Sequence, residues 1–347
     1  LVSPSARAAE ALAKHRLAAR PYSATALERY ARCPYQFYLH SVARLSPREV
    51  PERVEGLDPL TRGSFIHEAQ FRILRSLRDQ GALPLDSARL ALARAEVNRV
   101  FAEVEHEYRE RLAPAIEDVF RSHVDAIHAD LLEWVARLAE PEAAGAAFVP
   151  THFELAFGLP ARDGHDEASR RDPLPLAAGV TLRGSIDLVE RRGRGLRATD
   201  YKTGRNSTPA RLRLGGGQTL QPALYAMALE ALFPEDEVSG GRLYFCTTRG
   251  DWGAREVPLD EITRGGVRDV LAAIDGALAD GFLPPVPLED RTRSECTRCD
   301  YLGVCGEGEA RRVANKVARA TAKSRGTGDE AEQGKRLIQL DLVRRRE

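Results

Sequence analysis

Long apolar runs and a secretory leader are both missing from this sequence of 347 residues. Because no stretch of 18 consecutive apolar residues occurs, we expect no transmembrane helix. The first residues, LVSPSARAAEALAKHR, lack an apolar signal core, so secretion is not indicated and we expect a cytoplasmic location. The chain begins with Leu1 instead of Met, which we interpret as a sign of a piece of a longer polypeptide.

The sequence also lacks an excess of charge and a large number of cysteines. Its 51 Lys and Arg residues balance 51 Asp and Glu residues, so bulk positive charge is excluded as a reason to bind nucleic acid, though a local patch is not. Five cysteines are too few for a secreted disulfide scaffold. A hydrophobic content of 43% allows a sizeable core and excludes global disorder. The length predicts one large domain or two ordinary ones.

The spacing of apolar residues predicts helices first, then strands, then helices again. Residues 23–45 begin with Ser and Thr capping chemistry and continue at helical spacing, until Pro34 breaks the stretch just after Cys33. Alternation of apolar and polar residues predicts the strands. The predicted helices cover residues 23–45, 63–80, 218–233 and 260–281, with two or three more in 85–140. The predicted strands cover residues 151–160, 180–192, 196–204, 241–248 and 252–259.

Two acids and one lysine fall near the ends of two adjacent predicted strands. Alternation places Ile186 and Leu188 on one face and Asp187 on the other, while Asp200 and Lys202, two residues apart, point the same way. A tight turn between the strands would bring the three polar side chains into one compact site. Two carboxylates suit Mg²⁺ or Mn²⁺, and a neighbouring lysine can orient a metal-activated water. The alternative is a surface salt bridge between strand ends.

The segments GSIDLVE and ATDYKTG carry a family resemblance. They resemble the motif of the PD-(D/E)xK nuclease superfamily, in particular its RecB-like branch, with the motif residues falling on Asp187, Asp200 and Lys202. The resemblance implies an α/β fold with a restriction-endonuclease-like core, in which helices flank a mixed central sheet. It also implies that the two acids bind the metal and that the lysine positions the attacking water.

Three further segments match this family in the same order along the chain. The segment GSFIHEAQ resembles the helix that supplies a metal-binding histidine, which here would be His67. Glu154 falls on the preceding strand, where many relatives carry an acid, although strand acids are commonly just exposed. Gln221 and Tyr225 match a Gln-x-x-x-Tyr helix, and residues four apart share a helix face. The resemblance implies that this pair helps to hold the DNA strand.

The cysteines are distributed unevenly, with three of the five inside ten residues. Cys296, Cys299 and Cys305 supply three thiolates, whereas a metal or cluster normally requires four. Cys246 lies inside a predicted strand, which favours a buried apolar role. Cys33 lies in RYARCPYQFYL, which resembles the first half of the split [4Fe–4S] motif of AddB-type helicase–nuclease subunits and related CRISPR-adaptation nucleases. The resemblance implies a structural iron–sulfur cluster on four cysteines; a Cys₄ zinc site is the competing interpretation.

The resemblance extends over about residues 23–306 and suggests a division of the chain into five parts. The first is a loosely attached lead-in, and the second is a helical region that holds Cys33 and His67. A nuclease core, an iron–sulfur cysteine knuckle and a charged tail follow. The parts are residues 1–22, 23–147, 148–290, 291–310 and 311–347, respectively.

The expected function is Mg²⁺-dependent hydrolysis of DNA phosphodiesters by an exonuclease module that works with a helicase partner in double-strand break repair. Arg205, Arg211 and Arg213 follow the second motif strand and are candidate phosphate contacts, with a solvated basic loop as the alternative. A stand-alone CRISPR-adaptation-type exonuclease, a non-catalytic DNA-end-binding module and a zinc-stapled protein-interaction scaffold are the other possibilities. No membrane partner is expected.

Overall fold

The structure is a computed structural model that describes most of the chain. It describes residues 6–46, 56–140, 148–162, 164–211, 213–288, 294–306, 309–322, 324 and 329–345. Residues 1–5 of the predicted lead-in, 291–293 of the predicted knuckle and several residues of the predicted tail lie outside this part. Within it, every helix is either too short or too polar to cross a membrane.

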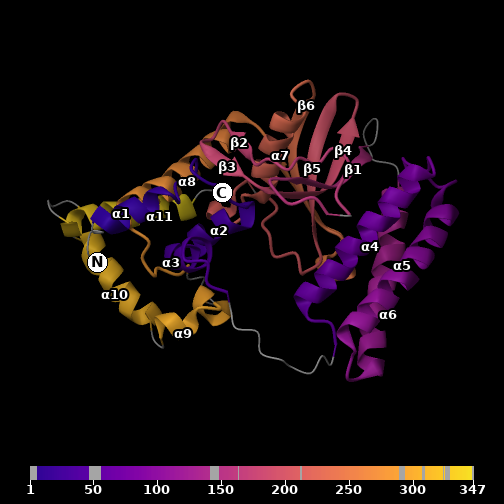
Figure 1. Cartoon of the computed structure of the whole chain (residues 1–347), viewed down its shortest axis with the longest axis horizontal. Coiled ribbons are helices and arrows are strands. Elements are labelled where there is room, and N and C mark those ends of the chain that lie inside the picture. Colours follow the sequence, from indigo (N-terminus) through magenta and orange to yellow (C-terminus); the bar gives the residue numbers. More distant parts are fainter. Residues whose placement is uncertain are drawn as a thin grey trace.

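A mixed sheet of five strands forms the centre of the molecule (Figure 1). Its strand order is β1-β4-β5-β6-β7, and only the β5–β6 pair is parallel, because α7 (Gln221–Leu232) crosses between these two strands. A separate pair, β2 and β3, packs beside it. The strands are β1 (Val149–Phe157), β2 (Leu174–Leu176), β3 (Val180–Leu182), β4 (Gly184–Arg192), β5 (Gly195–Lys202), β6 (Glu237–Phe245) and β7 (Ala254–Pro258).

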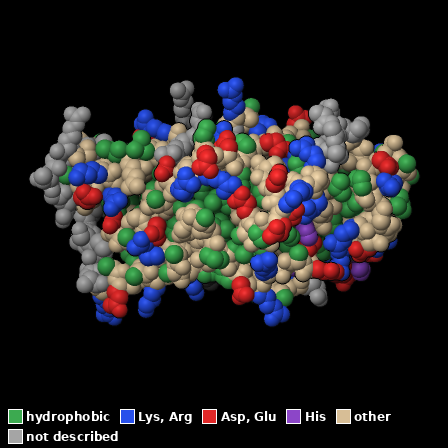
Figure 2. Space-filling view, turned by 90° about the horizontal axis from the view of Figure 1, so that it is seen from above, with side chains coloured by type: hydrophobic (Ala, Val, Ile, Leu, Met, Phe, Trp, Pro, Cys, Tyr) green, Lys and Arg blue, Asp and Glu red, His purple; other side chains and the backbone are tan. Residues whose placement is uncertain are grey.

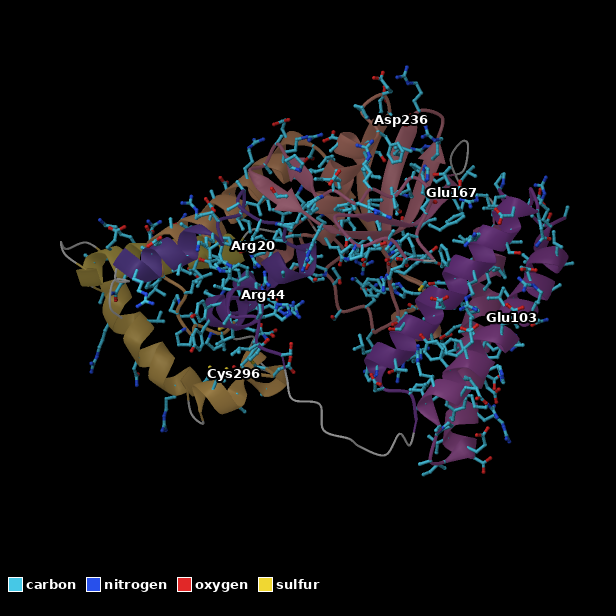
Figure 3. All side chains as sticks on the ribbon, in the orientation of Figure 1. Arg20, Arg44, Glu103, Glu167, Asp236 and Cys296 are labelled. Atoms are coloured by element: carbon cyan, nitrogen blue, oxygen red, sulfur yellow. The ribbon has the colours of Figure 1, made fainter. Side chains whose placement is uncertain are left out.

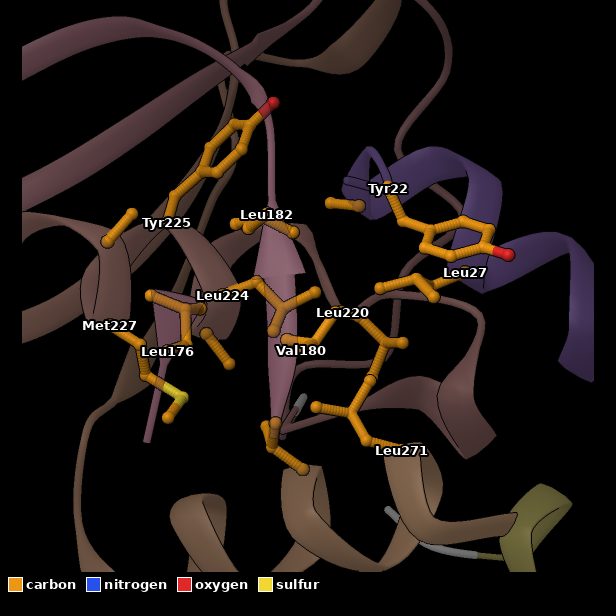
Figure 4. Close-up of a cluster of buried hydrophobic side chains, with 14 of the residues drawn as sticks. Tyr22, Leu27, Leu176, Val180, Leu182, Leu220, Leu224, Tyr225, Met227 and Leu271 are labelled. Atoms are coloured by element: carbon orange, nitrogen blue, oxygen red, sulfur yellow. The ribbon is translucent and has the colours of Figure 1, made fainter. Parts of the chain in front are cut away.

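Helices cover both faces of the sheet and enclose two hydrophobic clusters. One cluster gathers side chains of α2, α7, α8 and α11 against the sheet, and the other gathers those of α4, α5 and α6. Figure 4 shows the first cluster, where side chains of α7, such as Leu224, meet Leu182 of β3 and Leu27 of α2. The predicted restriction-endonuclease-like architecture, a mixed sheet flanked by helices, is therefore confirmed.

The helices agree with the predicted ranges to within a few residues. The 85–140 region holds two long helices, and the predicted break at Pro34 separates α2 from α3. The helices are α1 (Ala6–Ala13), α2 (Ala24–Arg32), α3 (Pro34–Phe37), α4 (Pro59–Asp79), α5 (Leu90–Leu112), α6 (Glu117–Leu138), α7 (Gln221–Leu232), α8 (Glu261–Asp280), α9 (Leu302–Cys305), α10 (Glu309–Ala322) and α11 (Asp329–Arg344). Short helical turns are η1 (Tyr38–Val42), η2 (Gly215–Gly217), η3 (Thr248–Gly250) and η4 (Glu295–Arg298).

Two terminal segments pack against the body of the molecule. In the lead-in, Leu17 is buried in the first cluster and Arg16 pairs with Asp275 of α8, so the expectation of loose attachment is wrong for its described residues. In the charged C-terminal segment, Leu340 and Val343 of α11 enter the same cluster. The lead-in is rich in alanine and arginine and the C-terminal segment is highly charged. A sequence does not show which of their larger apolar residues find a partner far along the chain.

Strand alternation breaks at two places, and each break corrects a prediction. The predicted strand 180–192 is divided at Arg183, whose N–H donates to the carbonyl of Tyr22, so β3 leaves the central sheet. Leu188 and Ile186, predicted to share a face, lie in different clusters, as do their partners Phe153 and Leu155 on β1. On β1, the φ of 51° at Glu154 interrupts the pleat between Phe153 and Leu155. On β4, the change of face falls at Asp187, where the pairing with β5 has ended.

Candidate active site

The site begins where β4 and β5 separate. Their pairing runs from the tight turn to Leu188 opposite Thr199 and stops there. Past this point the Asp187 carboxylate occupies the gap and accepts a hydrogen bond from the backbone N–H of Tyr201, at 2.8 Å. The strand ends are therefore tied by a side chain instead of the backbone ladder, and one Asp187 oxygen is held in a fixed place.

Three side chains that are far apart in the sequence meet beside this gap. His67 comes from α4, Glu154 from β1 and Asp187 from β4, and one ligand atom of each lies within 4.8 Å of the others. His67 Nδ1 is 3.5 Å from Asp187 Oδ2, and Ser185 Oγ donates to Glu154 Oε2 at 2.9 Å. The α4 helix is held in register at its start by Asp58, which caps the backbone N–H groups of its first turn.

Asp200 and Lys202 complete the site from β5. The Lys202 ammonium lies 2.5 Å from Asp200 Oδ2 and donates to Gln221 Oε1 at 3.1 Å, while Gln221 Nε2 donates to the Tyr225 hydroxyl at 3.4 Å. The Tyr225 ring packs on Gly184, where a Cβ would stand 3.1 Å from the Tyr225 oxygen. The absence of a side chain at Gly184 thus allows α7 to approach the strand that carries Asp187.

Burial and mutual repulsion shape the ionisation of these groups. Burial, reinforced by the charge of Asp200, raises the pKa of Asp187 well above its usual value, and burial with the charge of Asp187 raises the pKa of Glu154 to about 7. Burial lowers the pKa of His67. Burial would also lower the pKa of Lys202, but the Asp200 carboxylate more than offsets it, so that pKa is raised. The raised pKa values of Asp187 and Glu154 mean that the fold disfavours their simultaneous ionisation.

The sequence reasoning missed one buried acid beside the site. Glu28 of α2 is only 6% exposed, and its Oε1 accepts hydrogen bonds from the backbone N–H groups of Leu220 and Gln221 at 2.8 and 3.0 Å. It thus caps the first turn of α7, the helix whose Gln221 contacts Lys202. Burial raises the pKa of Glu28 to about 7. The only signal in the sequence was a charged residue between Leu27 and Tyr30 on a predicted apolar face.

A buried ion pair supports the other side of the site and was also missed. Arg62 of α4 donates to Asp130 of α6 at 2.7 Å and to the carbonyl of Thr203 at 3.2 Å, while Asp130 accepts from the N–H of Thr248 at 2.9 Å. Both side chains are at most 10% exposed. This network joins two helices to the ends of β5 and β6, one residue beyond Lys202.

The three candidate arginines do not share one environment. Arg213 is engaged by Asp260 at 2.7 Å and by the hydroxyl of Thr263 at 2.9 Å, at the start of α8. These contacts hold the Arg213 guanidinium at that helix start, and its expected phosphate contact stays a prediction. Arg205 and Arg211 are exposed on the loop after β5. Figure 2 shows positive and negative side chains interspersed over one face of the molecule, as the zero net charge implies.

The four cysteines predicted to act together line one pocket. Cys33, at the C-terminal end of α2, meets Cys296, Cys299 and Cys305 there, and Figure 3 labels Cys296 in the segment next to α9. Gln36 Nε2 donates to Cys299 Sγ at 3.7 Å, and burial raises the pKa of the Cys33 thiol to about 11. Cys246 is elsewhere, buried in the cluster under α4, α5 and α6.

Comparison with known proteins identifies the class that this fold and site define. The family model for the PD-(D/E)XK nuclease superfamily matches residues 21–306. The chain belongs to that superfamily, as its motif segments predicted.

Similarity to one curated protein indicates which branch of the superfamily the chain resembles. The chain is 28% identical over 242 residues to an AddB-type subunit of the ATP-dependent helicase/deoxyribonuclease of Carboxydothermus hydrogenoformans, an alignment covering 67% of this chain and 21% of that protein. The predicted resemblance to the RecB-like branch and its AddB-type subunits is confirmed. The aligned part is about a fifth of the relative's length, so the relative's name describes a much larger protein.

Proposed function

We propose that this chain is a divalent-metal-dependent DNA nuclease that hydrolyses phosphodiester bonds at the end of β5. One observation carries the proposal. His67, Glu154 and Asp187, from three separate elements, come within 4.8 Å of one another next to the Asp200–Lys202 ion pair. A surface salt bridge between strand ends would need neither the histidine nor the third acid, and it would not be buried.

The donor set fits Mg²⁺ or Mn²⁺. Asp187 and Asp200 would hold the metal with His67, and the Glu154 carboxylate lies within reach of the same place. Carboxylate oxygens suit both ions, and an imidazole nitrogen is more readily accepted by Mn²⁺. When bound, the metal supplies Lewis-acid stabilisation of the phosphate and lowers the pKa of a coordinated water.

The remaining residues orient the reactants. We propose that the Lys202 ammonium positions the attacking water and offsets negative charge that develops on the phosphate; its contacts with Asp200 and Gln221 support this role. Gln221 and Tyr225 form one hydrogen-bonded pair on α7, and we propose that they align the DNA strand. Arg205 and Arg211, exposed on the following loop, are proposed phosphate contacts.

A cleavage assay with end-labelled single- and double-stranded DNA tests this function directly. We expect cleavage with Mg²⁺ or Mn²⁺ and none with EDTA. Lys202→Ala should lower the cleavage rate by about 10³-fold or more, because the groups of such a site act as a unit. The same variant should bind DNA nearly as well as the wild type.

The matched control is Lys335→Ala, which removes an exposed lysine of α11 whose partner is Glu332. It should cleave at the wild-type rate. Cleavage by Asp200→Ala at near the wild-type rate would remove the nuclease assignment. Tight DNA binding without cleavage by the wild type would instead support an end-binding module.

We also propose that the four-cysteine pocket holds a structural [4Fe–4S] cluster. The support is that Cys33 and the three later cysteines line the same pocket, together with the sequence resemblance to the split motif. Four thiolates complete the ligand set of such a cluster. Anaerobically purified protein should be brown and contain iron and sulfide. If it contained zinc and no iron, the site would be a Cys₄ zinc site and the cluster proposal would be wrong.

The name of the curated relative, a helicase and deoxyribonuclease, supports a wider proposal. We propose that the chain is the exonuclease module of a helicase–nuclease in double-strand break repair. Degradation of long duplex DNA should then be stimulated by ATP only when a helicase subunit or domain is present. ATP-independent degradation at full rate would favour a stand-alone nuclease.

A further inference from the structure

A pocket lined by arginines lies beside α2, apart from the metal-binding side chains. It has a volume of about 340 Å³ and is lined by Arg20, Arg44 and Arg183, with His40 and the hydroxyl residues Ser23 and Ser41 among its walls. Figure 3 labels Arg20 and Arg44 near one another in this region. Within the described part of the chain, no Asp or Glu lines this pocket.

The three arginines are brought together by backbone contacts between distant segments. Tyr22 donates its N–H to Thr181 and accepts from the N–H of Arg183, so the segment before α2 runs along β3. Arg20 stacks at 4.3 Å over the Tyr22 ring and donates to the carbonyl of Ser41. The positive charges are therefore held close together by the fold, although like charges repel.

The pocket has hydrogen-bonding capacity that the protein does not use. Arg20 Nε is buried and has no hydrogen-bond partner, while Arg44 and Arg183 are exposed. Burial, together with the positive charges of Arg20 and Arg44, lowers the pKa of His15. A buried orphan donor next to two further guanidinium groups calls for an anion with several acceptor oxygens.

We propose that this pocket binds a backbone phosphate of the DNA strand that is cleaved at the metal site, a few nucleotides from the cleaved bond. Arg183 lies four residues before Asp187, which in extended chain corresponds to about 13 Å. A DNA strand advances about 3.4 Å per nucleotide along the helix axis, so the bound phosphate lies within a few nucleotides of the cleaved bond. This inference rests on the proposed nuclease function and adds an anchoring subsite to it.

The test measures binding of a fluorescent single-stranded oligonucleotide to Lys202→Ala protein, which does not cleave it. Adding Arg44→Gln and Arg183→Gln should weaken binding roughly tenfold at low salt. It should also reduce the slope of log K against log salt by about 0.7, the value for one phosphate contact on a single strand. Arg20 is left intact because it also supports Tyr22 and Ser41.

An uncharged linkage in the oligonucleotide shows which phosphate contacts the pocket. When a single methylphosphonate is moved along the oligonucleotide, one position should weaken binding of the parent severalfold and leave the double variant nearly unaffected. The control Arg94→Gln removes an exposed arginine from α5 and should behave as the parent. Arg44→Lys with Arg183→Lys should retain most of the salt slope, which separates loss of charge from misfolding.

The proposal is overturned if no methylphosphonate position distinguishes the double variant from the parent. It is also overturned if Arg94→Gln loses as much affinity as the double variant does. Failure of the nuclease proposal looks different, because the wild type then fails to cleave DNA whatever the binding data show. Competition by millimolar inorganic phosphate alone, without any linkage dependence, would show a free-anion site and overturn the DNA contact.

Discussion

Glu28 is a buried acid and Glu154 a half-buried one, and partial or full removal from water raises the pKa of each to about 7. Glu154 lies among the proposed metal ligands, whereas Glu28 contacts only the backbone at the start of α7. A raised pKa means that the folded state binds the proton more tightly than the unfolded state does. Such a group stabilises the fold below its unfolded pKa and loses this contribution as the pH rises to its folded pKa.

The first prediction concerns how the stability contributed by Glu28 changes with pH. As the pH rises from about 4.5 to about 7, the metal-free wild type should lose stability relative to Glu28→Gln, because only the wild type carries this buried acid. The glutamine oxygen can still accept from both backbone N–H groups, so the fold should persist. Urea denaturation of both proteins at pH 5 and pH 8 measures the difference, since Glu154 titrates in both. Equal pH dependence in the two proteins would show that Glu28 is ionised throughout.

Some site residues could be predicted from their sequence neighbours, and others could not. Asp187, Asp200 and Lys202 could be named from sequence because a tight turn places their strands side by side. Glu28 could not, because its partners Leu220 and Gln221 lie more than 190 residues away. The positive φ of Glu154 could not be predicted either, because glutamate gives no indication of a left-handed backbone conformation.

At the scale of elements, the buried Arg62–Asp130 pair joins α4 and α6 to the strand ends. Asp130→Ala should destabilise the protein by about 3–5 kcal/mol, because it leaves the Arg62 charge buried without its partner. It should also slow cleavage, since Arg62 contacts the carbonyl of Thr203 next to Lys202. Chemical denaturation and the DNA cleavage assay measure the two effects.

Asp118→Ala on the same helix is the matched control for this prediction. Asp118 is 93% exposed and lies 3.5 Å from Arg121, so its removal should change stability by less than about 0.5 kcal/mol. A second variant, Asp130→Leu with Arg62→Met, should recover much of the lost stability. If Asp130→Ala were as mild as the control, the buried pair would not support the site.

At the scale of the whole molecule, the N-terminal α2 and the C-terminal cysteines meet across the nuclease core. About 260 residues separate Cys33 from Cys296, and loop closure of this length restricts the unfolded chain by about 5–6 kcal/mol when a disulfide is taken as a crude guide. Backbone contacts add to this, since Arg344 donates to the carbonyls of Ala31, Arg32 and Val286.

Replacing a single cysteine should therefore destabilise the whole fold only when that cysteine belongs to the proposed cluster. Cys33→Ala should bleach the protein, release iron and lower the melting temperature, whereas Cys246→Ala should keep the iron and cost only local packing. Visible absorbance, iron and sulfide content and thermal melting of both variants measure this. Full iron content with an unchanged melt in Cys33→Ala, and loss of both in Cys246→Ala, would show that the fourth ligand was wrongly chosen.

The sequence by itself determined the family and most strands and helices of the central sheet and its covering helices, because periodicity and turns are properties of neighbouring residues. Only the tertiary structure decided that Arg213 pairs with Asp260 at the start of α8, that Glu28 supports α7 and that Arg20, Arg44 and Arg183 share one pocket. Each of these roles depends on a contact between segments far apart in the chain. Such contacts follow from how the sheet and its covering helices pack, which local spacing does not encode.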